Sequence, residues 1–335
     1  MSTEVTSEFN IEQWSQFLAR VRGEEPTWSI VLSTTILLVI FFVSLVGNVL
    51  TCFVIYYDKN MHTATNYYLF DLAISDLLAT FALLFDLYEH LFDSYRFGYV
   101  ACKLHFFFVI LLWNNSILIM TALAVERYIA IWHPLMLKSN ADWRRVMKVI
   151  AIVGIIAIME TLPEVWTVEL VKTKKSSVCF TVPTPFARVV NGVLALVTFV
   201  IPLVIMTFVY VMIALKVNFA EKTNSRTQIF NHRDHRGKVN KLVTALTLSF
   251  LVCWLPFCIF RVLIFVYNMR QLMNLKKWWS IGQRVMFFHN WFSIVLNPIL
   301  FSLMSTKFRK SLKLRIKKLW TPKCDGLELQ RTFVI

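Results

Sequence analysis

Seven long apolar runs constrain this chain more than any other feature of its sequence. Each contains roughly 20 or more mostly apolar residues, enough for a helix that crosses a hydrocarbon layer of about 30 Å. The runs cover about residues 28–57, 65–92, 100–132, 145–168, 187–216, 239–268 and 279–303. Because 57% of the residues are hydrophobic and only 16% are charged, we predict an all-α membrane protein, a seven-transmembrane helix bundle.

The runs divide the chain into four regions. Residues 1–27 form a polar, acidic tail without an apolar core, so we expect no cleavable signal peptide there and a first span that directs insertion. Residues 28–303 form the membrane domain. Over 304–320, apolar residues recur at helical spacing between lysines and arginines, which predicts an amphipathic eighth helix on the membrane surface. Residues 321–335 form a cytoplasmic tail.

The basic residues predict the orientation of the chain. The net charge is +15, and the bases gather after the third, fifth and seventh runs, over 138–148, 216–241 and 307–318. Cytoplasmic segments of membrane proteins carry such an excess of Lys and Arg. We therefore expect a multi-pass plasma-membrane protein with its N terminus extracellular and its C terminus cytoplasmic. An anionic membrane surface explains the charge better than nucleic acid does.

The third run ends in a candidate functional triplet. A helix from Cys102 to Arg127 rises roughly 37 Å, so the cysteine and Glu126-Arg127-Tyr128 lie at opposite membrane faces. Charged groups in a span are energetically costly and are therefore functional candidates. The alternative is an interfacial anchor in which Arg127 reaches the headgroups and Glu126 pairs with it.

Polar residues lie deep within several other runs. Asp76 is costly at mid-membrane unless it meets polar partners. Ser116, Ser293 and Asn297 are candidates to surround a small cation or waters with Asp76; the alternative is a hydrogen-bonded cluster, with Asn48, that only holds helices together. Prolines inside the spans predict kinks and hinge points. They are Pro202, Pro256 and Pro298.

Charged residues also lie near the outer ends of the runs. Asp86 and Glu89 lie near the exit of the second run and would attract a cationic ligand, although acids there can also form a solvated rim. Further acids near the outer side are Asp93, Glu160, Glu164 and Glu169, of which we assign Asp93 and Glu169 to the rim. Arg261 and Arg284 either take a ligand's carboxylate or carbonyl groups or pair with these acids.

The sequence gives no sign of an enzyme. It lacks the zinc-peptidase, phosphate-loop and serine-hydrolase motifs, and its six cysteines have no zinc-binding spacing. Six cysteines permit one disulfide if two of them face an oxidising compartment.

Taken together, these residues closely resemble the rhodopsin-like (class A) G-protein-coupled receptors over about residues 40–320. The matching residues occur in order along the chain. They are Gly47-Asn48, Leu72-Ala73-Ile74-Ser75-Asp76, Cys102, Glu126-Arg127-Tyr128, Pro163, Cys179, Pro202 with Tyr210, Phe250 with Cys253-Trp254-Leu255-Pro256, and Asn297-Pro298.

The resemblance implies roles for individual residues. It implies an outer disulfide between Cys102 and Cys179, and G-protein coupling through Glu126, Arg127 and Tyr128, with Glu126 holding Arg127 at rest. The activation switch would comprise Trp254, Phe250, Pro256, Tyr210, Asn297, Pro298 and Phe301. An allosteric sodium ion would bind at Asp76, Ser116, Ser293 and Asn297; we expect no other cofactor.

Several positions depart from the family pattern. Phe301 stands where the family has tyrosine, Gly154 and Tyr95 stand where it has tryptophan, and a common proline is missing near Leu84. Altered packing is the expected result. The third-run aspartate of amine receptors falls at Val109, and the retinal lysine of opsins falls at Trp291, which argues against both ligand classes.

The ligand class follows from the same resemblance. The segment from Asn60 to Leu69 is most similar to peptide receptors of the neuromedin U, pyrokinin and ghrelin group, and Asp86-Leu87-Tyr88-Glu89 with Arg261 to the neuromedin U branch. A second acid expected in the third run is Ile110 here. The implied ligand is a short peptide with a basic, amidated end. Its predicted contacts are Asp86, Glu89, Arg261, Arg284, Phe257 and Trp291.

The predicted function is therefore a plasma-membrane receptor for an extracellular neuropeptide that activates a heterotrimeric G protein. The alternatives are a receptor-like protein with a non-peptide ligand or no coupling, and a seven-helix transporter or pump. Arrestin is a further expected partner, and Phe333-Val334-Ile335 has the form of a PDZ-domain ligand, although a frayed tail is the simpler interpretation. Cys324 is a candidate for palmitoylation or a free thiol.

Overall fold

The computed structural model describes residues 16–17, 26–92, 94–133, 142–172, 177–223 and 230–320. Within these ranges seven helices are long and apolar enough to cross a membrane, which confirms the predicted seven-helix class. Asp93, Cys324, the tail 321–335 with its proposed PDZ ligand, and nearly all of the N-terminal tail lie outside the described residues.

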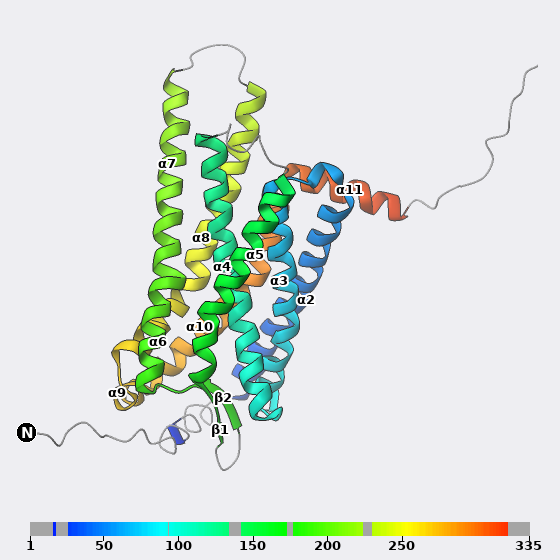
Figure 1. Ribbon diagram of the computed structural model, residues 1–335. Coiled ribbons are helices and arrows are strands. Elements are labelled where there is room, and N and C mark those ends of the chain that lie inside the picture. The colour runs from blue at the N-terminus through cyan, green and yellow to red at the C-terminus, as the bar shows by residue number, and fades with distance from the viewer. Residues whose placement is uncertain are drawn as a thin grey trace, which may run out of the picture.

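The seven spans pack side by side as one bundle (Figure 1). The first three are single helices: α2 (Thr27–Tyr57), α3 (Ala64–Phe92) and α4 (Gly98–Trp132). The fourth combines α5 (Asp142–Thr161) with a 3₁₀ turn, η2 (Leu162–Trp166). The fifth combines α6 (Pro185–Ala195), the π-helical turn η3 (Leu196–Val200) and α7 (Ile201–Thr223). The last two are α8 (Phe230–Val266) and α10 (Lys276–Met304).

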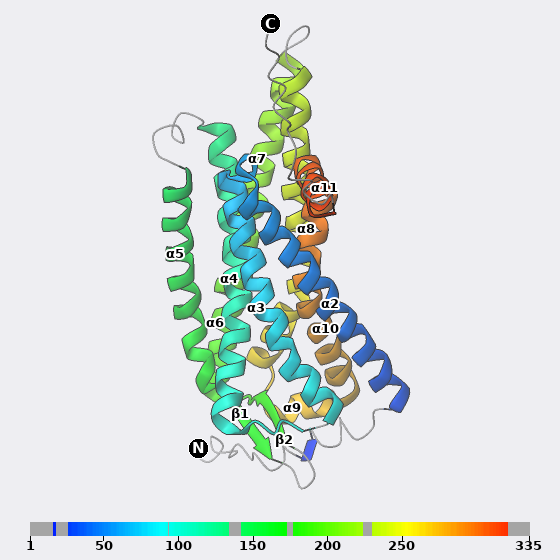
Figure 2. The same cartoon turned by 90° about the vertical axis from the view of Figure 1, so that its right-hand side faces the viewer.

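Helix α8 begins at Phe230, well before the run predicted from about residue 239. Hydropathy marks only the part of a helix that lies in lipid, whereas the backbone hydrogen bonds continue into the polar segment that precedes it. The predicted amphipathic helix is α11 (Thr306–Trp320), which runs crosswise to the spans (Figure 1) and is seen end-on in Figure 2.

Three short elements were not anticipated from the sequence. A 3₁₀ turn, η1 (Lys59–Met61), joins α2 to α3, and α9 (Met269–Asn274) joins α8 to α10. Strands β1 (Val168–Lys172) and β2 (Ser177–Thr181) form an antiparallel hairpin between the fourth and fifth spans. The hairpin and α9 lie at the opposite end of the bundle from α11 (Figure 1).

A proline in α10 organises the contact between the first and seventh spans. Pro298 has no N–H, so the carbonyl of Ile294 lacks its helical partner. The Asn48 amide donates to that carbonyl at 3.0 Å. Gly47 makes the approach possible, since a Cβ at this position would lie 2.9 Å from Pro298 Cγ. The deep polar residue Asn48 therefore satisfies a backbone group that the proline exposes.

The fifth span accommodates its proline differently. Pro202 is the second residue of α7 and follows the π-helical turn η3 directly. Within that turn the regular hydrogen-bond ladder is already interrupted, so the missing N–H of Pro202 adds little further cost.

Helix α11 is fastened to the end of the bundle by aromatic and charged contacts. The rings of Phe301 and Phe308 lie 4.6 Å apart, and the Arg315 guanidinium donates to the Tyr57 carbonyl. Hydrogen bonding from Ser311, followed by Asn60 and the charge of Arg315, lowers the pKa of Asp58 beside this helix. Phe301 therefore packs where the family pattern places a tyrosine.

We predict that Gly47→Ala destabilises the protein by about 1–3 kcal/mol, because its methyl group forces α2 away from the rigid Pro298 ring and weakens the Asn48 hydrogen bond. Thermal unfolding of the purified protein in lipid nanodiscs measures the effect. Gly154→Ala is the matched control, since a Cβ there meets nothing within 4 Å. Equal melting temperatures for both variants would contradict this account of the α2–α10 contact.

Candidate functional site

The β-hairpin is fixed to the bundle by a disulfide and by hydrogen bonds. Cys102 of α4 is bonded to Cys179 of β2, which confirms the predicted disulfide. The Tyr95 N–H donates to the Ser177 carbonyl at 2.7 Å, and the Ser177 hydroxyl donates back to the Tyr95 carbonyl at 2.6 Å. These bonds hold the hairpin over the bundle at a defined position.

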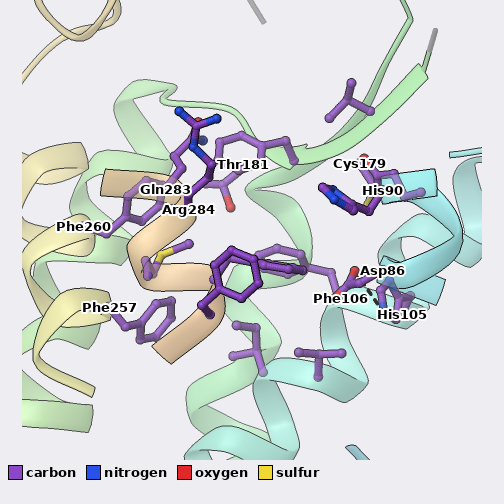
Figure 3. Close-up of a pocket in the computed structure, with 18 of the residues that line it drawn as sticks. Asp86, His90, His105, Phe106, Cys179, Thr181, Phe257, Phe260, Gln283 and Arg284 are labelled. Atoms are coloured by element: carbon purple, nitrogen blue, oxygen red, sulfur yellow. Dashed lines mark ion pairs between the residues drawn. The ribbon is translucent and has the colours of Figure 1, made fainter. Parts of the chain in front are cut away.

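Beneath the hairpin lies a pocket of about 280 Å³. It is lined by side chains from α2, α3, α4, η2, the hairpin, α6, α8 and α10, and Figure 3 shows side chains converging on it from several sides. The lining includes Asp86, Glu89, His90, His105, Phe106, Glu164, Phe180, Asn191, Phe257, Phe260, Arg284 and Met286. Four of the six predicted ligand contacts, Asp86, Glu89, Arg284 and Phe257, are therefore brought together here.

Two carboxylates and two histidines form one side of the pocket. Asp86 and Glu89 both line it, and Glu89 is only 9% exposed. His105 Nε2 lies 3.2 Å from the Ala82 carbonyl and 3.7 Å from Asp86 Oδ1 (dashed in Figure 3). Because a carbonyl only accepts, His105 Nε2 is the donor to Ala82, and Asp86 lies close to the same ring nitrogen. His90 Nε2 lies 2.5 Å from the Ser33 hydroxyl.

Neither histidine was identified from the sequence. The approach of His105 to Asp86 depends on how α3 and α4 face each other. His90 follows Asp86 by four residues on α3, a helical spacing that could have pointed to it. Tyr95 lies near the same carboxylates: burial, followed by the charges of Glu89 and Asp86, raises the pKa of its phenol.

On the opposite side of the pocket lie Arg284, Gln283 and Thr181 (Figure 3). The pocket therefore has an acidic side and a basic side.

Arg261 does not line the pocket, contrary to its predicted role as a ligand contact. It is 1% exposed and donates to Glu164 at 2.6 Å and to Asn191 at 3.3 Å. Its guanidinium also lies 4.4 Å from the centre of the Phe257 ring. The structure thus realises the alternative in which this arginine pairs with an acid, because a buried cation needs a nearby counter-charge.

Trp291 is likewise fully buried and lies outside the pocket lining. It belongs to an aromatic cluster centred on Trp113, which forms part of the pocket's wall. The Trp113 ring lies 5.7 Å, edge to face, from each of Trp254, Phe257 and Trp291. Trp113 was not singled out from the sequence, although it follows Val109 by one helical turn on the same face.

Trp254 of this cluster is one of the predicted switch residues. Phe250 is buried and stacks on Phe199 with ring centres 5.3 Å apart, and Pro256 interrupts α8 just beyond Trp254. Tyr210 packs, partly buried, against the main core. Trp254 also lines a second, smaller cavity, while its neighbour Trp113 lines the first pocket.

Three of the four predicted sodium-site residues, Ser116, Ser293 and Asn297, line this smaller cavity. Asn297 Nδ2 donates to Asp76 Oδ2 at 2.9 Å, and the Ser293 hydroxyl donates to the Asn290 carbonyl at 2.6 Å. Carboxylate, amide and hydroxyl oxygens are the ligands that hard cations prefer. The residues therefore fit both a small cation and a hydrogen-bonded cluster.

At the other end of α4, Glu126 is buried and lies 2.5 Å from Arg145 Nη2 of α5. This partner was not anticipated, since the resemblance paired Glu126 with Arg127. Nearby, Lys216 of α7 donates to the Ile131 carbonyl at 2.8 Å and lies over the Trp132 ring. The end of α4 that carries Arg127 is therefore tied to both α5 and α7.

Seven spans, a disulfide-anchored hairpin above a polar pocket, and a charged triplet at the far end define a seven-helix receptor. Residues 47–301 match the family described as 7 transmembrane receptor (rhodopsin family), and the chain belongs to that family. It is a multi-pass membrane protein of the G-protein-coupled receptor class, and nothing in the comparisons favours a transporter or pump.

The chain is similar to several named receptors. It is 31% identical over 309 residues to human neuromedin-U receptor 1, covering 82% of this chain and 70% of the relative. It is 28% identical to the neuromedin U receptor homolog nmur-2 of Caenorhabditis elegans, covering 92% and 85%. It is also 28% identical to the human substance-P receptor, covering 86% and 72%. The resemblance to receptors of the neuromedin U branch is thereby confirmed.

We predict that Arg261→Met destabilises the receptor by on the order of 3–5 kcal/mol, because it leaves Glu164 buried without its counter-charge. The double variant Arg261→Met with Glu164→Leu should recover most of the loss. Thermal unfolding measures both. Glu169→Gln, which breaks a partly exposed pair with Lys103, should change stability by less than about 1 kcal/mol. Failure of the double variant to recover would show that the pair is not the source of the effect.

Proposed function

We propose that this protein is a receptor for a short extracellular peptide with a basic end, which it senses to activate a heterotrimeric G protein. The observation that carries the proposal is the acidic side of the pocket, where Asp86 and Glu89 face the cavity beneath the hairpin. The relatives are named for neuromedin U and substance P, which supports a ligand of the peptide class.

The size and charge of the pocket support binding of one end of a peptide. About 280 Å³ holds a few side chains, so the remainder of a peptide would extend past the hairpin. A cationic side chain of the peptide would lie against Asp86 and Glu89, where partial desolvation strengthens the attraction. Arg284, on the other side, would receive carbonyl oxygens of the peptide backbone or end group.

Signalling would occur by a population shift. The peptide binds more tightly to an active arrangement, in which the end of α8 away from the hairpin has moved outward, than to the resting arrangement. This difference in affinity is worth on the order of 1–3 kcal/mol. Trp113 and Trp254 lie between the pocket and the smaller cavity, so a ligand that shifts Trp113 changes the packing of α8 at its proline. Glu126 and Arg127 would then open toward the G protein.

We place the hairpin end of the bundle outside the cell. The disulfide there suits an oxidising compartment, and the basic helix α11 at the other end suits the anionic cytoplasmic leaflet. Plasma-membrane location, an extracellular N terminus and a cytoplasmic C terminus follow. Allosteric sodium at Asp76, Ser116, Ser293 and Asn297, and binding of arrestin and a PDZ domain, stay predictions.

We predict that Asp86→Asn and Glu89→Gln each lower the potency of basic peptide agonists about tenfold or more, because each removes one charge-assisted contact worth about 1.5–3 kcal/mol. A peptide-library screen for calcium or cyclic-nucleotide responses supplies the agonists and measures the effect. Agonists whose basic residue is replaced by a neutral one should have the same potency on these variants as on the unaltered receptor. Glu169→Gln, outside the pocket, is the matched control variant. Unchanged potency for both variants would refute the ligand site.

We predict that Arg127→Ala reaches the cell surface but loses at least nine-tenths of agonist-dependent nucleotide exchange on a co-expressed G protein. Removal of this guanidinium takes away the group assigned to the G-protein interface. An epitope tag ahead of Thr27, stained on intact cells, measures surface expression. The same stain tests the proposed orientation. Full signalling by this variant would exclude the coupling role.

A further inference from the structure

Beside the pocket, an apolar cluster joins the hairpin to α8, α9 and α10. Its buried members are Val171, Val182, Phe260, Ile264, Leu272 and Trp279. Phe17, from the N-terminal segment, inserts into this cluster and is only 5% exposed, whereas the adjacent Gln16 is exposed. We call these six residues the Phe17 socket. A residue ahead of the first span is thus packed among elements contributed by the second half of the chain.

The Phe17 socket is continuous with the ligand pocket. Phe260 belongs to both, and its ring lies 6.2 Å from Phe180 and 4.9 Å from Trp279. Phe180 and Met286, which line the pocket, also pack against the socket. A ligand in the pocket therefore reaches the socket along an apolar wall, without crossing a charged group on that wall.

The chemistry of the socket selects an apolar side chain. All six members are aliphatic or aromatic, and the ring of Phe17 demonstrates that a phenyl group fits among them. Phe17 is almost fully buried in this cluster, and its burial removes one phenyl group from water. An aromatic side chain of a ligand would regain the same contacts, so the two occupants are exchangeable.

We propose that the Phe17 socket is a second subsite of the peptide pocket, which binds an aromatic or large aliphatic side chain next to the peptide's basic end, and that Phe17 occupies it until the peptide displaces it. This inference rests on the proposed peptide function. It adds a hydrophobic specificity element to the acidic one and makes the N-terminal segment an internal competitor of the ligand.

Binding to the full-length receptor in lipid nanodiscs tests the exchange. The probes are two sets of amidated peptides that end in two arginines and carry, at one upstream position in turn, either Phe or Ser. Phe17→Ala should raise the affinity of at least one Phe peptide on the order of tenfold, since a competing phenyl group is gone. It should leave the Ser peptides unchanged. Gln16→Ala, the exposed neighbour, should change neither.

Equal or weaker binding of every Phe peptide to Phe17→Ala would mean that Phe17 is a fixed part of the wall, and would overturn the proposal. A second measurement needs no ligand. The fully buried Leu272 is replaced by cysteine, and the maleimide labelling of the introduced thiol is timed with Phe17 or alanine at position 17. Labelling should be at least several-fold faster with alanine, and a bound Phe peptide should slow it again.

Equal labelling rates would show that Phe17 does not occupy the socket, and would also overturn the proposal. Faster labelling in Phe17→Ala together with no binding of any peptide would separate the two hypotheses. In that case the proposed basic-peptide function fails, and the ligand assigned to the socket fails with it, while occupancy by Phe17 stands.

Discussion

Lipid offers no hydrogen bonds, so every polar group within the spans needs a partner inside the protein, and this constraint determines how the helices meet. Pro298 exposes the Ile294 carbonyl, Asn48 satisfies it, and Gly47 provides the space for that approach. Between α3 and α10, the Asn297 amide likewise donates a hydrogen bond to the Asp76 carboxylate. The polar residues of the bundle are therefore its points of attachment, while the apolar residues fill the space between them.

The same constraint explains which charged side chains in the outer half of the bundle are paired and which face the pocket. Arg261 is buried and neutralised by Glu164, with Asn191 and the Phe257 ring completing its surroundings. It therefore holds α8 against the fourth and fifth spans instead of facing a ligand. This leaves Asp86 and Glu89 as the acidic side of the pocket, with His105 directed toward Asp86. A pocket organised in this way favours a cationic group at one defined place.

The aromatic cluster connects this pocket to the interior. Trp113 forms part of the pocket wall and contacts Trp254, which in turn borders the cavity lined by Ser116 and Asn297. Trp113 and Trp254 meet edge to face at 5.7 Å, an arrangement that aromatic pairs prefer. Pro256 lies inside α8 two residues beyond Trp254. The Phe17 socket continues the apolar wall of the pocket through Phe260.

The sequence by itself determined the seven spans, the class of receptor, the disulfide between Cys102 and Cys179, and the acidic residues of the outer side, because hydropathy and ordered motifs are properties of a linear chain. Only the tertiary structure decided which charged and polar side chains lie against each other. Arg145 for Glu126, Glu164 for Arg261 and His105 for Asp86 each come from a different helix. The β-hairpin, the central place of Trp113 and the burial of Phe17 were also settled there. These contacts depend on the rotation and depth at which one helix faces another, and a single sequence carries no direct record of that geometry.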